Sequence, residues 1–111
     1  MGVDVETIVP GDGRTYARPG DKVSMHYVAR LATTEQQIDS SIDRGIQFRF
    51  QVGVGQVIKG WDEGIQRISL GEKARMRITA DLGYGALGAG GSVPPNTDLL
   101  FEVEVLDINS F

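Results

Sequence analysis

Few residues in this sequence are suited to acid–base, nucleophilic or metal chemistry. His26 is the only histidine and there is no cysteine. A thiol nucleophile, a disulfide, a Cys-ligated zinc site and a two-histidine metal motif are therefore excluded. A Ser-His-Asp triad would depend on His26 alone, which falls on the polar face of a predicted strand. We expect His26 to be structural or simply exposed, and we expect no metal and no cofactor.

Two further patterns look functional but are better explained by structure. Residues 83–88 match G-x-G-x-x-G, but the residues after them, which end in Pro94 and Pro95, cannot form the helix that would bind a pyrophosphate. The adjacent carboxylates Asp62 and Glu63 fall on a predicted helix with no basis for a shared site. We expect this pair to form a solvated face.

The more informative residues are apolar. They come from separate segments, several of them on the inward faces of predicted strands: Tyr27, Phe48, Trp61, Tyr84, Val93 and Phe101. These side chains could simply fill the core. A small sheet with one helix has a limited interior, however, and an apolar pocket with a few polar groups at its edge is the usual form of a ligand site. On the residues alone, both interpretations stay open.

Alternation of apolar and polar residues predicts the strands that would position these side chains. The clearest strand runs from Lys22 to Leu31 and has one apolar face made of Val23, Met25, Tyr27, Ala29 and Leu31. Further strands are predicted at residues 3–8, 46–52, 70–78 and 98–108. In the second of these the inward residues are Ile46, Phe48, Phe50 and Val52. We expect a short edge strand that ends at Ile38, loops at residues 39–41 and 43–45, and a long loop at residues 81–96.

One short helix is predicted around Trp61, the only tryptophan. Its apolar residues recur at helical spacing: Ile58, Trp61, Ile65 and Ile68. Gly60 and Gly64 each cost a helix about 1 kcal/mol relative to alanine. We therefore expect a helix surface without side chains, either for packing or to leave room beside the indole. The fold class expected is α+β, a curled antiparallel β-sheet wrapped around one short α-helix.

Length, composition and charge narrow the class of protein. With 111 residues, 41% of them hydrophobic, the chain is expected to form a single domain, 1–111. No run approaches the roughly 18 apolar residues of a membrane span, and the first residues lack the features of a signal peptide. We expect a cytoplasmic protein without a membrane partner. The net charge of −4 argues against nucleic acid, and we expect Lys73, Arg75 and Arg77 to form a solvated strand face.

These segments together resemble the FK506-binding proteins, an immunophilin family of peptidyl-prolyl cis-trans isomerases, in their small single-domain cytosolic form. The resemblance is most specific in the runs Val57-Ile58-Lys59-Gly60-Trp61-Asp62-Glu63-Gly64 and Tyr84-Gly85-Ala86. It extends nearly end to end, through residues 5–8, 10–15, 23–27, 39–41, 94–95 and 100–104.

The resemblance implies an isomerase that acts on X-Pro bonds, with the Trp61 indole as the floor of a proline-binding pocket. The walls it implies are Tyr27, Phe48, Val57, Ile58, Tyr84, Val93 and Phe101. Asp39, steadied by Arg44, would be a carboxylate at the edge, and the Tyr84 hydroxyl and the Ile58 backbone N–H would bond substrate carbonyls. Gln56, where the family often has glutamate, would act through its backbone carbonyl. The implied catalytic residues are Tyr27, Asp39, Phe48, Trp61, Tyr84 and Phe101.

Several departures from the family pattern affect this pocket. Ile38 stands where a phenylalanine usually touches the proline ring, so activity or ligand preference is expected to shift. The loop before Ile38 lacks the usual Asp-Gly turn and is one residue longer. Residues 89–92 replace a bulkier loop tip with alanine, glycine and serine, so we expect a looser lid. Ala29, normally glycine, is a milder departure.

The resemblance also implies ligands and partners. These are proline-containing peptides and proteins, and the macrolides FK506 and rapamycin, bound by a monomer. The drug-bound form would engage calcineurin or the TOR kinase. The alternative is a binding module of the same fold with little catalysis, which Ile38 and the glycine-rich lid favour.

Overall fold

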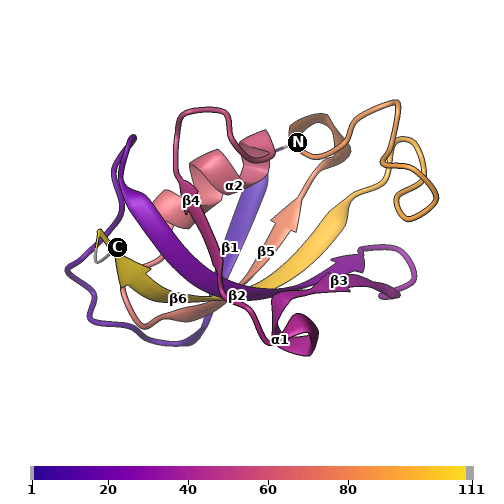
Figure 1. Ribbon diagram of the computed structural model, residues 1–111. Helices are drawn as coiled ribbons and strands as arrows, with labels where there is room; N and C mark the ends of the chain where they lie inside the picture. The colour runs from indigo at the N-terminus through magenta and orange to yellow at the C-terminus, as the bar shows by residue number, and fades with distance from the viewer. Residues whose placement is uncertain (1, 110–111) are drawn as a thin grey trace.

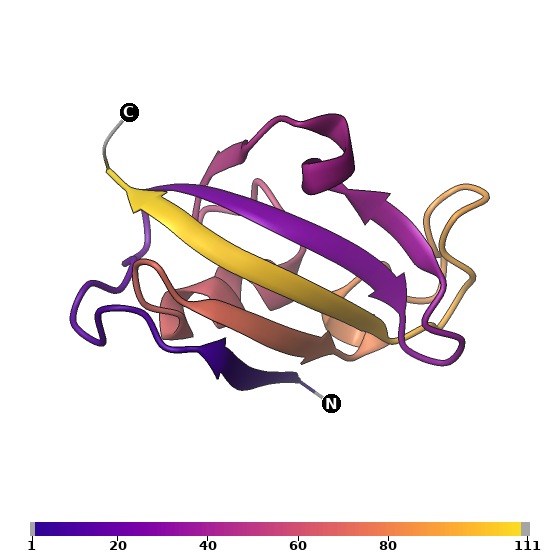
Figure 2. The same ribbon diagram turned by 90° about the horizontal axis from the view of Figure 1, so that it is seen from below.

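In the computed structural model, which describes residues 2–109, an antiparallel sheet curls around one short helix (Figure 1). The strands are β1 (Val3–Val9), β2 (Lys22–Leu31), β3 (Gln37–Ser40), β4 (Phe48–Gln51), β5 (Lys73–Ile78) and β6 (Leu99–Ile108). Their order is β1-β5-β6-β2-β3, and β4 pairs with the first half of β2. The view in Figure 2 shows β2 and β6 side by side along the middle of the sheet. The predicted α+β architecture is confirmed.

The inner face of the sheet follows the predicted alternation. On β2 the buried residues include Val23, Met25, Tyr27, Ala29 and Leu31. The register with β6 places Ala29 opposite Phe101 and Tyr27 opposite Val103. Because successive side chains of a strand point to opposite faces, this register brings Tyr27 and Phe101 to the same side of the sheet.

The helix α2 (Lys59–Gly64) lies in the hollow of the sheet and continues as a 3₁₀ turn, η1 (Ile65–Arg67). It is shorter than the helical spacing predicts, because Ile68 already has extended backbone. The prediction for the glycines is confirmed. A Cβ atom on Gly60 would lie 2.5 Å from Ile78 Cγ2, and one on Gly64 would lie 2.6 Å from the Met76 sulfur. The bare backbone therefore lets α2 pack directly on β5.

The segment from residue 37 to residue 45 is more regular than predicted. The edge strand β3 continues past Ile38 to Ser40, and a short helix α1 (Ser41–Arg44) follows where a loop was expected. The Ser40 side chain caps this helix by accepting the Asp43 N–H at 3.1 Å, and Gly45 ends it with a φ of 69°. Both are standard capping signals, which the sequence interpretation did not use.

The predicted strand at residues 46–52 is also shorter in the structure. Strand β4 begins only at Phe48, and the side chain of Ile46 is 67% exposed, so its assignment to the inner face was wrong. Gly45 and Ile46 leave α1 through a turn, in which the Ile46 N–H bonds the Ser41 carbonyl. The alternation that placed Ile46 inside therefore holds only from Phe48 onward.

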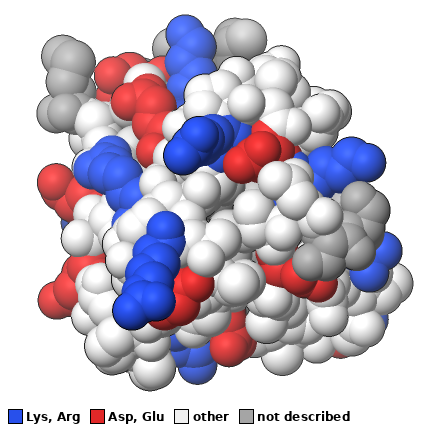
Figure 3. All heavy atoms as spheres, turned by 90° about the vertical axis from the view of Figure 1, so that its left-hand side faces the viewer, with Lys and Arg blue, Asp and Glu red and all other residues white. Residues whose placement is uncertain are grey.

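The outer face of the sheet mixes charges of both signs. Lys73, Arg75 and Arg77 are exposed on β5, as predicted. Ion pairs connect this part of the surface: Arg30–Glu102 at 2.6 Å, Arg77–Asp98 at 3.4 Å and Arg75–Glu6 at 3.7 Å. In the view of Figure 3 basic and acidic side chains also lie next to one another. Within residues 2–109, no helix has the length and apolar character that a membrane crossing requires.

Candidate active site

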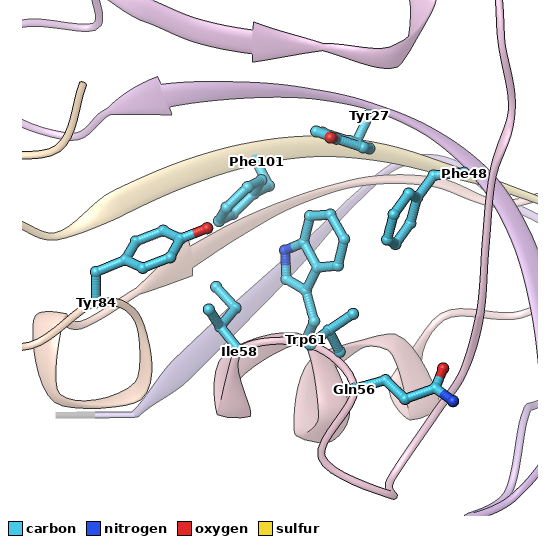
Figure 4. Close-up of a pocket in the computed structure, with 8 residues that line it drawn as sticks. Tyr27, Phe48, Gln56, Ile58, Trp61, Tyr84 and Phe101 are labelled. Atoms are coloured by element: carbon cyan, nitrogen blue, oxygen red, sulfur yellow. The ribbon is translucent and has the colours of Figure 1, made fainter. Parts of the chain in front are cut away.

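An apolar pocket lies over the indole of Trp61 (Figure 4). Its main lobe has a volume of about 480 Å³ and is lined by Tyr27, Phe48, Gln56, Val57, Ile58, Trp61, Tyr84 and Phe101. A smaller lobe of about 240 Å³ shares four of these residues and adds Ala29, Ile38, Asp39, Ala89, Ser92 and Val93. The structure thus brings together every ligand-binding residue expected from the sequence except Arg44, which lines neither lobe.

The floor of the pocket is a cluster of aromatic rings around Trp61, whose side chain is only 6% exposed. The indole makes edge-to-face contacts with the rings of Tyr27, Phe101 and Phe48, at centroid distances of 4.9, 5.1 and 5.5 Å. Each such pair adds about 0.5–1.5 kcal/mol beyond burial. The indole nitrogen is buried without a hydrogen-bond partner in the described chain, on the side of the ring that faces Phe101 and Ile58 (Figure 4). The floor is therefore rigid and almost purely apolar.

A hydrogen-bonded triad of Tyr27, Asp39 and Arg44 stands at the edge of the pocket. The Tyr27 hydroxyl donates to Asp39 Oδ2 at 2.6 Å, and Arg44 donates to the Tyr27 hydroxyl at 3.0 Å and to Asp39 Oδ1. Arg44 thus acts on the pocket through its two partners, which line it.

The triad fixes the ionisation of the pocket edge. Partial burial opposes the charge of Asp39, but hydrogen bonds from Tyr27, Arg44 and the Ser40 N–H together lower the pKa of its carboxyl below the ordinary value of 3.8. Burial, followed by the hydrogen bond to Asp39, raises the pKa of the Tyr27 hydroxyl. At neutral pH the edge therefore presents a carboxylate, a neutral phenol and a guanidinium.

The backbone register and one buried hydroxyl hold this triad in place. Asp39 pairs with Ala29 across β3 and β2. The hydroxyl of Ser41, which is fully buried, accepts the Tyr27 N–H at 2.7 Å and lies 2.9 Å from His26 Nδ1. His26 therefore packs outside the pocket, behind Tyr27, and the prediction of a structural histidine is confirmed.

The long loop before β6 brings Tyr84 and Val93 to the pocket. It follows a 3₁₀ turn, η2 (Ala80–Leu82), and is held by its own backbone. Ala89 and Val93 exchange hydrogen bonds of 2.9 and 3.1 Å across a turn in which Gly90 has a φ of 51°. That positive φ explains the glycine, and whether this lid is loose stays a prediction. Tyr84 is 42% exposed, and within residues 2–109 its hydroxyl has no hydrogen-bond partner.

Asp62 is the residue of this region that the sequence interpretation missed. Its two carboxylate oxygens accept the backbone N–H groups of Gly53 at 2.8 Å and Gly55 at 3.0 Å. The prediction of a merely solvated pair is therefore wrong for Asp62, although it holds for Glu63, which is exposed. The Gly-x-Gly pattern at residues 53–55 was a signal that the sequence contained. Two glycines this close favour a tight turn with positive φ, and the structure has values of 78° and 80° there. The N–H groups of such a turn need acceptors from elsewhere in the chain.

The curled sheet around one helix, with an aromatic pocket over the helix tryptophan, is the arrangement expected for a prolyl isomerase, and the comparison with known families agrees. A family model described as FKBP-type peptidyl-prolyl cis-trans isomerase matches residues 13–106. The chain therefore belongs to the FKBP-type peptidyl-prolyl cis-trans isomerase family.

Individual relatives match almost end to end. A peptidyl-prolyl cis-trans isomerase of Schizosaccharomyces pombe is 51% identical over 98% of this chain and 96% of its own length. FK506-binding protein 1A of Emericella nidulans is 53% identical over 98% of this chain and all of its own length. FK506-binding protein 1 of Saccharomyces cerevisiae is 50% identical over 96% and 93%.

Proposed function

We propose that this protein is a peptidyl-prolyl cis-trans isomerase, a single domain of residues 1–111 that isomerises X-Pro bonds in the pocket over Trp61. The observation that carries the proposal is the floor of aromatic rings, with hydrogen-bonding groups confined to the pocket edge. Family membership and a relative that is named as an isomerase and matches nearly the whole chain support the same activity.

An apolar pocket of this kind suits the chemistry of prolyl isomerisation. An X-Pro bond favours trans by only about 0.5–1 kcal/mol, yet it isomerises over tens to hundreds of seconds. The barrier, roughly 18–20 kcal/mol for peptide bonds, arises from amide resonance. Twisting the C–N bond removes this resonance and much of the charge separation, so the transition state is less polar than the planar amide. An apolar site penalises the planar form more than the twisted form, and this differential binding is catalysis.

The chain's residues can be given roles on this basis. The proline ring would lie on Trp61 between the rings of Tyr27, Phe48 and Phe101 in the main lobe, with Gln56, Val57 and Ile58 along one side. The backbone N–H of Ile58 lies at the start of α2, where N–H groups have no partner inside the helix, and is available to a substrate carbonyl. The free Tyr84 hydroxyl supplies a second donor, and Asp39 orients the amide. Ile38 and Val93 would contact the neighbouring residue in the smaller lobe.

The same pocket is proposed to bind the macrolides FK506 and rapamycin, because these molecules resemble a twisted prolyl amide. The names of the FK506-binding relatives support this ligand class. We further propose a cytoplasmic monomer that acts on proline-containing peptides and proteins, and whose drug-bound form engages calcineurin or the TOR kinase.

A protease-coupled assay on an X-Pro peptide, run with and without FK506, tests the proposed function. We expect acceleration of cis-to-trans conversion that one equivalent of FK506 abolishes. Macrolide binding without catalysis would instead make the protein a recognition module on an isomerase fold. Absence of both would refute the assignment of the pocket.

A further inference from the structure

The connection between β4 and α2 carries Gln56, Val57 and Ile58 to the wall of the main lobe. Unlike the long loop on the opposite side of the pocket, the turn at residues 53–57 is held in the described chain mainly by hydrogen bonds to side chains. The acceptors in these hydrogen bonds are side-chain oxygens. Gly53 and Gly55 donate to Asp62, and the Gln51 N–H donates to Gln56 Oε1 at 2.9 Å. The position of this pocket wall therefore depends on very few side chains.

Asp62 is a rigid anchor because its own backbone is fixed in the helix. Its N–H bonds the Ile58 carbonyl at 3.2 Å, and its carbonyl accepts Gln66 Nε2 at 2.7 Å. It directly follows Trp61, whose indole is locked among the rings of the floor. The Asp62 carboxylate therefore fixes the distance between the pocket floor and the loop at residues 53–57.

Close packing on one side limits the alternative conformations of the loop at residues 53–57. A Cβ atom on Gly53 would lie 3.0 Å from Pro19 Cα and Cβ, so the backbone packs closely on Pro19 at this point. The loop is therefore held by Pro19 on one side and by Asp62 on the other. Each of the two glycine N–H groups, of Gly53 and of Gly55, donates to its own oxygen of the Asp62 carboxylate.

We propose that Asp62 is a positioning residue of the isomerase site. Its two oxygens hold residues 53–57, and through them Val57 and the Ile58 N–H, at the correct height over Trp61. Asp62 itself lines neither lobe of the pocket, so it would act on a bound peptide only through the loop. The inference rests on the proposed function, since it assigns a residue to that site.

The number of acceptor oxygens gives this proposal a specific test. Asp62→Asn keeps the shape of the side chain but has a single acceptor oxygen, so one glycine N–H loses its bond, and the remaining bond loses its charge assistance. Asp62→Glu keeps both oxygens on a longer arm. We expect D62N to lower kcat/KM for an X-Pro peptide about ten-fold, mostly through KM, because the loop contacts the peptide in both the ground state and the transition state. D62E should recover most of this loss.

Glu63 supplies a matched control on the same helix. It is the adjacent residue, it is exposed, and in residues 2–109 its carboxylate has no hydrogen bond or ion pair. Glu63→Gln removes the same charge and should leave KM unchanged. Amide hydrogen exchange measured by NMR gives a second readout: exchange at Gly53 and Gly55 should speed up in D62N and stay as in the wild type in E63Q.

The outcomes separate this inference from the function it rests on. Wild-type protein without isomerase activity refutes the proposed function whatever the variants do. An active wild type with the same KM in D62N overturns the role of Asp62 alone, as does a raised KM with unchanged exchange at Gly53 and Gly55. Should D62N fail to fold, D62E decides, because exchange at Gly53 and Gly55 and the KM must then change together. Both near wild type, or both raised, supports the proposal, and a change in one without the other overturns it.

Discussion

The floor and the edge of the pocket are built in different ways. Trp61, Tyr27 and Phe101 are at most 6% exposed, so the floor is also part of the hydrophobic core. At the edge, the side chains of Asp39 and Arg44 are 43% and 46% exposed and are held by hydrogen bonds. This difference implies that changes to the floor reduce stability and catalysis together, whereas changes to the edge reduce catalysis alone.

The largest effect is expected from Trp61→Ala. Removing a buried indole costs about 3–5 kcal/mol of unfolding free energy, because the contacts around it are lost and a cavity remains. Catalysis should fall to near the uncatalysed rate, since the floor of the site is gone. Urea denaturation and the isomerase assay measure the two effects.

Ile65→Ala is the matched control for the floor. Ile65 is fully buried directly after α2 but lines neither lobe of the pocket. Its replacement should cost a comparable 2–5 kcal/mol and leave kcat/KM near wild type at temperatures where the variant is folded. An equal loss of catalysis in both variants would show that the assay reports stability and not the floor.

A smaller effect, confined to activity, is expected from Asp39→Asn. The substitution removes the ion pair with Arg44 and the charged acceptor of the Tyr27 hydroxyl. We expect kcat/KM to fall about five-fold with a stability change below about 1 kcal/mol, because pairs this exposed contribute little to folding. A large drop in melting temperature would contradict the proposed difference between edge and floor.

The pH dependence of the wild type sharpens the same point. The pKa of Asp39 is lowered in the folded protein, so its stabilising contribution is complete above the unfolded-state pKa of about 3.9. It is lost only as the pH falls through the lower folded-state value. Activity attributable to this carboxylate should therefore be flat from about pH 8 to pH 5, and a pH–rate profile checks it. A decline that begins near pH 6 would identify another titrating group.

The smallest effect is expected from Ile38→Phe. Ile38 is half-buried and lines the smaller lobe beside Ala29 and Val93. Restoring a ring at this position adds contact area at the edge, so we expect turnover or macrolide affinity to rise about two- to three-fold with stability unchanged. Isothermal titration calorimetry with FK506 and the isomerase assay measure it. Values equal to wild type would show that Ile38 is not a working part of the wall.

Much of the fold was predictable because burial on one face leaves a period in the sequence. The strand from Lys22 to Leu31 and the close packing of Gly60 followed from alternation and helix propensity. The residues alone left a pocket and a filled core as equal interpretations, and the pocket residues came from the family resemblance. Asp62 was missed because a hydrogen bond from loop backbone to a distant side chain produces no periodicity. Helix α1 was missed because its caps, Ser40 and Gly45, resemble loop residues when they enclose only four others.

The most direct test of the central claim uses the fact that Trp61 is the only tryptophan, so that fluorescence excited selectively from tryptophan, and not from tyrosine, reports the pocket floor. Fluorescence would be followed during titration with FK506, in parallel with inhibition of prolyl isomerisation. We predict a saturable change at one equivalent, with the same midpoint as the inhibition curve. Inhibition that saturates while the Trp61 signal stays constant would place the catalytic site elsewhere on the molecule.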